Sequence, residues 1–423
     1  MGSKKQFMCE EIVAEILSWV PVKSLIRFRS VCKSFNTLIS HPSFVKLHLH
    51  RSTNTDDLSR LEIIPKSHFK DPHELYDHKP CSVRSFLDFA RDVRHQSTFV
   101  KYSVVGSCNG LLCVACETGP WGVYLWNMAM RLRSQKSPPI FFDDGFELES
   151  ISFGFGHDGL SDTYKVVALL LGVDAMEDTL QVVPKVYTMS DSCWRDLECF
   201  PNLNFIEYDI DDGVYLKGTL NWIAMVDYFT YEEHVFDFEL IIISIDLGKE
   251  TCRPLCLPDG LGCSKPTLGV LRDTLCVWHD HNTHFVIWQM KEFPDAMSWI
   301  QLVNVSYFNL QIDPISLCSV IPLYMCKNGD VLMLSSTRGR EWVAIVYNQR
   351  NHRLRRSGVS TRRDMVYLEP KSICLVSFFL VPFILSCNVD MATCAHVHVG
   401  KEPELRIQTV IEVNETLMPI DTY

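Results

Sequence analysis

The residues best suited to chemistry in this 423-residue chain are three histidines well past its middle. His279, His281 and His284 fall within six residues of one another, beside Asp280. Histidines two apart in a strand share a face, so their imidazoles could converge on a zinc ion. The same residues also suit an ordinary polar turn between the apolar runs on either side. We favour the hairpin turn, and we expect no metal and no cofactor.

The cysteines form no stronger pattern. The chain has 17, and Cys113 and Cys116 make its only C-x-x-C. They fall in a strand-like run, where positions three apart point to opposite faces, and no second pair follows at zinc-ribbon distance. Cys252, Cys256 and Cys263 form a looser cluster. We interpret the cysteines as free, buried thiols.

Motifs of catalysis are absent from the sequence. Asp209, Asp211 and Asp212 look like the start of a calcium loop, but the closing glutamate would fall at Leu220. The chain has no G-x-S-x-G, no phosphate-binding G-x-x-x-x-G-K-[ST] and no H-E-x-x-H. We therefore expect a protein that is not an enzyme.

Composition describes a globular chain with an acidic balance. Hydrophobic residues make up 47% and charged residues 22%, which excludes a disordered protein. A formal net charge of −11 argues against nucleic acid or a membrane surface as partner. Residues 1–20 lack a basic region followed by an apolar core, so we expect no secretory signal and a cytoplasmic or nuclear location.

Residues 10–39 predict three short helices. Ile12, Val13, Ile16, Leu17 and Val20 recur at helical spacing and make one wide apolar face. The proline that follows ends this helix, and further apolar residues predict a second helix and a third, which stops before another proline. A unit of this size is below the roughly 40 residues at which chains usually fold unaided. Part of its apolar surface must therefore meet a partner or another domain; a small helical subdomain packed on its own core is the alternative.

From residue 102 onward the sequence pattern changes to short apolar runs between turn residues, which predicts many strands. The runs repeat: residues 107–113, 212–222, 271–278 and 327–334 each combine a turn with a strand, followed by strands that carry an aromatic residue. Their spacing of roughly fifty residues is typical of kelch-type propeller blades. We favour a β-propeller over a β-sandwich of similar strand count, because the order of turn, strand and aromatic residue recurs.

The end of the chain is different. Six arginines crowd residues 350–363, and residues 373–385 are almost purely apolar. Thirteen residues are too few for a membrane span of about 20 residues. We interpret the apolar run as a buried strand pair that closes the propeller, with a divergent end as the alternative. We expect the arginines in an exposed loop rather than in a nuclear address.

The N-terminal helices carry a specific resemblance. They resemble the F-box of the large plant F-box families, with matches at residues 15–17, 20–21, 23–25, 27–29, 31–35 and 38–39. The sequence departs from that pattern twice: Met8-Cys9 stands where the family has Leu-Pro, and Phe35 stands where it has Trp. The missing proline loosens the start of the first helix, and Phe35 fills less volume.

The strand-rich part resembles the F-box-associated domain that follows the F-box in many plant proteins. The matching motifs lie at residues 106–113, 125–127, 154–158, 164–167, 216–222, 243–246 and 286–290. The resemblance implies an α+β multidomain protein: an F-box at residues 8–50, a linker at 51–100, a mostly β, kelch-like propeller at 101–368 and a divergent tail at 369–423.

The resemblance also implies a function. It predicts the substrate-recognition subunit of a Skp–cullin–F-box (SCF) ubiquitin ligase, which binds a Skp-type adaptor, reaches a cullin scaffold through it and holds an unidentified target protein. The adaptor surface would comprise Ile12, Ile16, Leu17, Val20, Pro21, Leu25, Val31 and Phe35, some of which serve the internal core instead.

For the target we expect an aromatic and acidic loop that includes Tyr228, Phe229, Tyr231 and His234, because exposed loop aromatics often anchor interfaces. A loop packed on a neighbouring blade is the alternative. The competing functions are a propeller that binds a protein without ubiquitin-ligase activity and a metal-dependent propeller enzyme.

Overall fold

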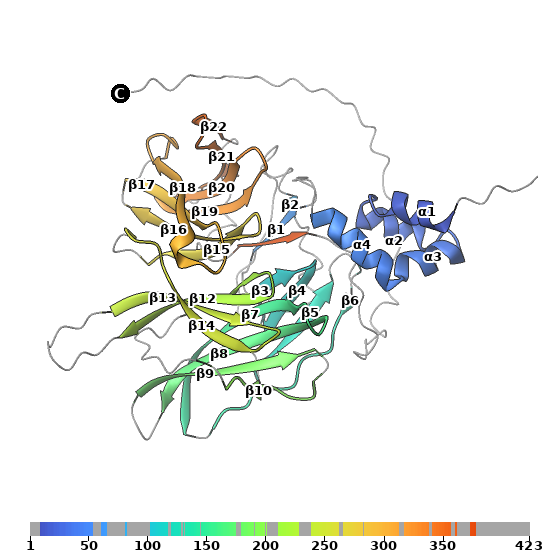
Figure 1. Ribbon diagram of the computed structural model, residues 1–423, viewed down its shortest axis with the longest axis horizontal. Coiled ribbons are helices and arrows are strands. Elements are labelled where there is room, and N and C mark those ends of the chain that lie inside the picture. Colours follow the sequence, from blue (N-terminus) through green and yellow to red (C-terminus); the bar gives the residue numbers. More distant parts are fainter. Residues whose placement is uncertain are drawn as a thin grey trace, which may run out of the picture.

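The structure is a computed structural model of the whole chain. It describes residues 9–53, 61–65, 81–82, 102–116, 120–127, 130, 132–143, 145–174, 179–189, 191–198, 200, 210–227, 238–261, 265–281, 283–312, 317–337, 341–356, 360–361 and 373–377. Helices occupy the start of this range and strands the remainder, as the sequence predicts (Figure 1).

The N-terminal unit contains four helices rather than the three expected. They are α1 (Glu10–Leu17), α2 (Val22–Phe28), α3 (Lys33–Ser40) and α4 (Pro42–Thr53). Pro21 is the N-cap of α2, and Pro42 is the first residue of α4, where a proline loses no hydrogen bond. The unit has its own core, made of Leu17, Val22, Leu25, Ile39, Phe44 and Val45.

The strands form five consecutive antiparallel sheets, which are the blades of a five-bladed β-propeller. The first blade contains β3 (Tyr102–Cys108), β4 (Leu111–Cys116), β5 (Gly122–Asn127) and β6 (Leu132–Arg133). The second contains β7 (Phe146–Asp158), β8 (Thr163–Asp174), β9 (Thr179–Thr188) and β10 (Arg195–Asp196). The third contains β11 (Val214–Leu216), β12 (Thr219–Asp227), β13 (Phe238–Asp246) and β14 (Thr251–Cys256).

The fourth blade contains β15 (Thr267–Leu271), β16 (Thr274–His281), β17 (His284–Met290) and β18 (Trp299–Ser306). The fifth contains β19 (Leu317–Met325), β20 (Asp330–Thr337), β21 (Glu341–Asn348) and β22 (Arg353–Arg356), with β23 (Ser360–Thr361) paired to β21. A short 3-10 helix, η2 (Ala296–Ser298), precedes β18.

Tight turns explain the recurring sequence motif. Asn109 and Gly110 both have positive φ, 51° and 79°, between the first two strands of the first blade. Lys217 and Gly218 do the same in the third blade, with φ of 45° and 87°. Two successive residues with positive φ make the turn whose twist matches a β-hairpin. Each motif therefore starts the second strand of a blade.

The hydrophobic core lies between blades. One cluster joins residues of the first and second blades, for example Val105 and Phe153, and another joins Leu169 of the second blade to Ile243 of the third. Two further clusters continue the series from the third blade to the fifth. A sandwich would bury one core between two sheets, so this succession excludes that alternative.

A sixth sheet, with three strands, joins distant parts of the chain. Its strands run in the order β2 (Cys81–Ser82), β1 (Leu61–Pro65) and β24 (Ile373–Ser377), all antiparallel. The start of the apolar run at residues 373–385 is thus a strand that pairs with a segment preceding the propeller. The boundaries of the linker and tail stay a prediction.

Part of the arginine-rich segment corrects an expectation, although Arg350 lies in a turn and Arg362 and Arg363 lie outside the described residues. Arg353, Arg355 and Arg356 lie in β22, the strand paired to β21 in the fifth blade, and not in a loop. A strand with one side turned to solvent suits such residues because their stems can cover its surface. In the part of the chain that the structure describes, no helix is long and apolar enough to cross a membrane.

Candidate functional site

The helical unit presents an apolar stripe to solvent. Ile12, Ile16 and Trp19 fall at i, i+4 and i+7 of α1 and the turn after it, and each is more than half exposed. Val31, in the α2–α3 connection, is 67% exposed. A single exposed apolar residue needs no explanation, but a stripe of them marks an interaction surface.

The predicted adaptor residues divide between this surface and the interior. Ile12, Ile16, Pro21 and Val31 are exposed, and Val20 and Phe35 are half-buried. Leu17 and Leu25 are buried in the core of the helical unit, so they are core residues and not contact residues. Trp19 was not singled out from the sequence, although it is also exposed and its spacing from Ile12 and Ile16 places it on their side of the helix.

The two departures from the F-box pattern have visible consequences. Cys9 is the N-cap of α1 and makes no side-chain capping bond, although Glu10 and Glu11 in the first turn favour the helix dipole. The ring of Phe35 packs 6.3 Å from that of Phe28, centroid to centroid, and thus against the unit's own core. Met8 lies outside the described residues.

Helix α4 connects the helical unit to the propeller (Figure 1). Leu49 packs against the core shared by the first two blades. Lys46 Nζ lies 2.7 Å from Asp162 Oδ2, in the β7–β8 turn. Asp162 Oδ1 also lies 3.3 Å from His157 Nε2. The α4 contacts therefore place the helices at the end of the propeller where β8 begins.

Arg51 of α4 fixes α1 in turn. Its guanidinium forms an ion pair with Glu15, bonds the hydroxyl of Ser18 and lies 4.9 Å from the ring centroid of Trp19. One arginine thus holds both the backbone of α1 and an aromatic residue of the exposed stripe. The stripe has a defined direction relative to the propeller.

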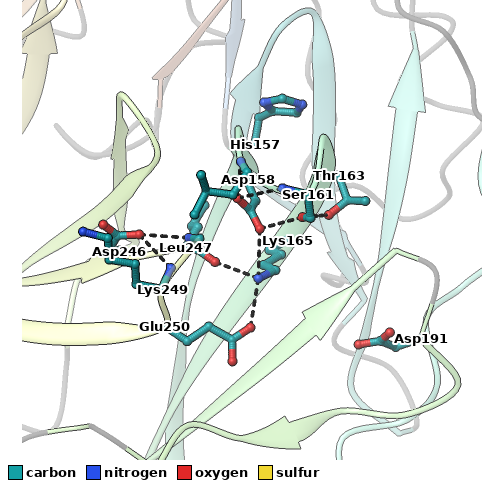
Figure 2. A network of polar contacts seen from close by, with 12 residues as sticks. His157, Asp158, Ser161, Thr163, Lys165, Asp191, Asp246, Leu247, Lys249 and Glu250 are labelled. Atoms are coloured by element: carbon teal, nitrogen blue, oxygen red, sulfur yellow. Dashed lines mark hydrogen bonds and ion pairs between the residues drawn. The ribbon is translucent and has the colours of Figure 1, made fainter.

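A buried charge network joins the second and third blades (Figure 2). Lys165 Nζ lies 3.1 Å from Asp158 Oδ2 and 2.9 Å from Glu250 Oε1, and it donates to the carbonyl of Leu247 at 2.7 Å. Arg195 binds the other side of Glu250, with Nη1 and Nη2 each on one carboxylate oxygen. The network closes the second blade against the β13–β14 turn.

The network keeps its carboxyl groups ionised. Burial alone would raise the pKa of Asp158, but bonds from the Ser161 hydroxyl, the Leu160 amide and Lys165 lower it to about 2. Hydrogen bonds from Arg195 and then Lys165 lower the pKa of Glu250 to about 2 against the opposing effect of burial. Because both carboxyl groups are held far from neutral pH and are paired with cations, the network suits a structural role.

The three histidines lie in the expected hairpin. His281 pairs with His284 across the turn between β16 and β17. His279 lies one step further along the same face, with its ring centroid 5.8 Å from that of His281. In the ranges that the structure describes, no three His, Cys, Asp or Glu side chains are arranged to hold a metal ion.

The two cysteines of the C-x-x-C lie in the interior. Cys113 and Cys116 are buried in β4, and burial raises the pKa of the Cys113 thiol well above its ordinary value. A thiol of that kind is unreactive.

The predicted target residues Tyr228, Phe229, Tyr231 and His234 lie outside the described residues, between the end of β12 and the start of β13.

Two family models match the chain. An F-box domain matches residues 7–47, and an F-box associated beta propeller domain matches residues 76–379. The chain belongs to the F-box protein family. Its domain pair supports a role as a substrate-recognition adaptor, and members of this family are typically non-catalytic.

The relatives of this F-box protein include several from Arabidopsis thaliana. An F-box/kelch-repeat protein is 30% identical over 339 residues, which cover 75% of this chain and 88% of the relative. A putative F-box only protein 9 is 24% identical, with 78% and 84% covered. The F-box protein CPR1 is 27% identical, with 70% and 72% covered.

Proposed function

We propose that this F-box protein is the substrate-recognition subunit of an SCF-type ubiquitin ligase. The observation that carries the proposal is the exposed stripe of Ile12, Ile16 and Trp19, which stands on a helical unit that already has its own core. A Skp-type adaptor would cover this stripe. The adaptor would in turn connect the chain to a cullin scaffold. The assembly would act in the cytoplasm or the nucleus.

The mechanism is proximity and needs no catalytic group in this chain. A target held on the propeller has its lysines at high effective concentration near a conjugating enzyme carried elsewhere in the assembly. This requires that the target site keep its direction relative to the adaptor. The contacts of Leu49, Lys46 and Arg51 in α4 supply that constraint.

The proposal is tested by co-purification of the full chain with a Skp-type adaptor. Ile16→Arg should weaken binding more than about tenfold, since it buries an unpaired charge in the contact. Leu17→Arg is unsuitable, because Leu17 is 5% exposed and its replacement would unfold the helical unit. Met297→Arg is the matched control, since Met297 is an exposed apolar residue of the propeller.

Adaptor binding by Met297→Arg should equal that of the native chain, and all variants should keep the native melting temperature. Adaptor binding by folded Ile16→Arg within twofold of the native value would refute the assignment of this stripe. Failure of the native chain itself to bind would show that the departures at Met8, Cys9 and Phe35 disable the F-box. The propeller would then bind a protein without delivering it to ubiquitination.

A further inference from the structure

The fourth blade contains an open pocket at its hairpin end. The pocket has a volume of about 310 Å³ and is lined by Gly260, His279, His281, His284, Val286, Trp288, Gln301 and Asn304. Leu275 and Val277, which precede His279 on the same face of β16, pack against the third blade. The pocket therefore lies on the side of the fourth blade that faces the third.

Its position suits target binding. The helices contact the β7–β8 turn, where the second strand of a blade begins, whereas His281 is the last residue of β16, the second strand of its own blade. Second strands run in the same direction around a propeller, so the pocket opens at the end away from the helices. Figure 1 shows the helices on one side and β16 and β17 on the other.

The polar groups of the pocket are mainly donors. Thr283 Oγ1 lies 2.8 Å from His284 Nδ1, which leaves Nε2 of His284 for a ligand. The indole N–H of Trp288 and both ring nitrogens of His279 are buried without a hydrogen-bond partner in the described part of the chain. Asn304 Nδ2 donates to Gln301 Oε1 at 3.3 Å, so this bond does not use the amide N–H groups of Gln301.

These donors select the charge of the ligand. Among the residues that the structure describes, the lining contains no carboxylate that would repel an anion. An indole N–H can donate but cannot coordinate a cation, which disfavours a metal. The described lining residues also include no arginine or lysine, and phosphate sites in proteins usually rely on those residues. A carboxylate is the group that fits best.

An exposed aromatic residue follows the segment that is bonded to the histidine turn. The N–H of Tyr307 donates to the carbonyl of Thr283 at 3.0 Å, which ties the β18–β19 connection to the histidine turn. The next residue, Phe308, is almost fully exposed. An exposed aromatic side chain beside a polar pocket is a common anchor of protein interfaces.

We propose that this pocket is the target-binding site and that it accepts a carboxylate side chain, Asp or Glu, of the target protein. The word "target" rests on the proposed function, but carboxylate binding does not. Imidazole N–H groups of His281 and His284 donate to the two carboxylate oxygens, and the Gln301 amide and Trp288 lie behind them. Phe308 contacts an apolar residue next to the acidic one.

The experiment titrates the full chain, without adaptor, with a terminally blocked peptide that has one glutamate flanked by glycines. Binding is followed by the NMR signals of the histidine imidazoles. The glutamine version and the phosphoserine version of the peptide are the comparison probes. We expect the glutamate peptide to shift the signals of His281 and His284, and to bind at least about tenfold more tightly than the glutamine peptide.

Variants make the result specific. His281→Leu with His284→Leu should abolish binding, whereas His352→Leu, a surface histidine of the fifth blade, should leave it unchanged. Gln301→Glu should weaken binding of the glutamate peptide, and Gln301→Lys should strengthen it. This opposite response would not follow from a loss of folding, which melting temperatures would detect.

Equal binding of the glutamate and glutamine peptides, or tighter binding of the phosphoserine peptide, would overturn the proposal. The proposal would also be overturned if the pocket bound none of the three peptides but bound Zn²⁺, with a higher affinity for Zn²⁺ in Gln301→Glu. The adaptor experiment above is independent: loss of adaptor binding with peptide binding intact would refute the ligase role alone.

Discussion

Replacement of Lys165 by methionine tests the charge network between the second and third blades. Methionine has a similar length but no charge, so the change leaves Asp158 as a carboxylate with 2% of its surface exposed and no cation beside it. Removal of one partner of a buried ion pair costs about 3–5 kcal/mol. Glu250 retains Arg195, and Asp158 retains its bonds to Ser161 and the Leu160 amide, so we expect the lower end, about 3 kcal/mol.

The lowered pKa of Asp158 gives a second estimate of the free-energy cost of Lys165→Met. A fall from 3.8 to about 2 corresponds to roughly 2.5 kcal/mol of preference for the ionised form, of which Lys165 supplies only part. The remaining cost of Lys165→Met comes from the lost bonds to Leu247 and Glu250. The two figures agree in order of magnitude.

The assay is urea unfolding at pH 7, followed by tryptophan fluorescence, with Lys185→Met as matched control. Lys185 also pairs with an aspartate, but that partner, Asp196, is 71% exposed, so its loss should cost less than about 1 kcal/mol. The double variant Asp158→Asn/Lys165→Met should be more stable than Lys165→Met alone, because no buried charge remains unpaired. Equal losses for Lys165→Met and Lys185→Met would refute the reasoning.

Three further predictions concern other contacts. At low salt, Lys46→Glu should lower the free energy of unfolding by less than about 1 kcal/mol and so lower the melting temperature slightly. Asp162→Lys in the same chain should restore it; a double variant no better than the single one would show that the two residues are uncoupled. The two carboxyl groups that bind Lys165 have folded-state pKa values of about 2, below their ordinary values of 3.8 and 4.5. Their stabilising contribution is therefore complete above about pH 4.5 and is lost as the pH falls towards 2, so the urea midpoint should drop between pH 5 and pH 3 in the native chain and less in Lys165→Met. Gly213→Ala would place a methyl group 2.4 Å from a buried indole and should cost about 1–3 kcal/mol by melting, whereas Gly159→Ala, with open space around it, should cost less; similar losses would contradict the close packing.

Local patterns predicted the elements well. The periodicity of Ile12 to Leu17 and the prolines at 21 and 42 gave the helices, and the turns at Gly110 and Gly218 gave the second strands of blades. These signals are local because helix caps and tight turns depend on a few neighbouring residues.

Helix α4 was missed for a physical reason. Phe44 and Val45 face the core of the helical unit, whereas Leu49 faces the propeller. A helix that buries two sides shows no single apolar stripe, so its period is obscured. The same ambiguity explains why the sequence did not separate buried Leu17 from exposed Ile16. Both are apolar neighbours on α1, and only packing decides which one points inward.

Contacts between blades could not be read from spacing. Asp158, Lys165 and Glu250 come from three different strands and turns, and the carboxylate of Glu250 lies 85 positions beyond the lysine that it binds. The histidine pattern, in contrast, was visible, and the hairpin was predicted. The neighbours that complete the pocket, Gly260 and Gln301, carry no motif of their own.

The pairing of β1 with β24 has a consequence for synthesis. Residue 61 pairs with residue 377, so β1 leaves the ribosome long before its partner exists. At about 5–20 residues per second, the wait for roughly 300 residues is on the order of 15–60 seconds. Throughout that interval the residues of the helical unit and its exposed stripe have all been synthesised, while β1 has an unpaired edge. If the stripe binds an adaptor as proposed, its residues are available for binding before the propeller can be completed.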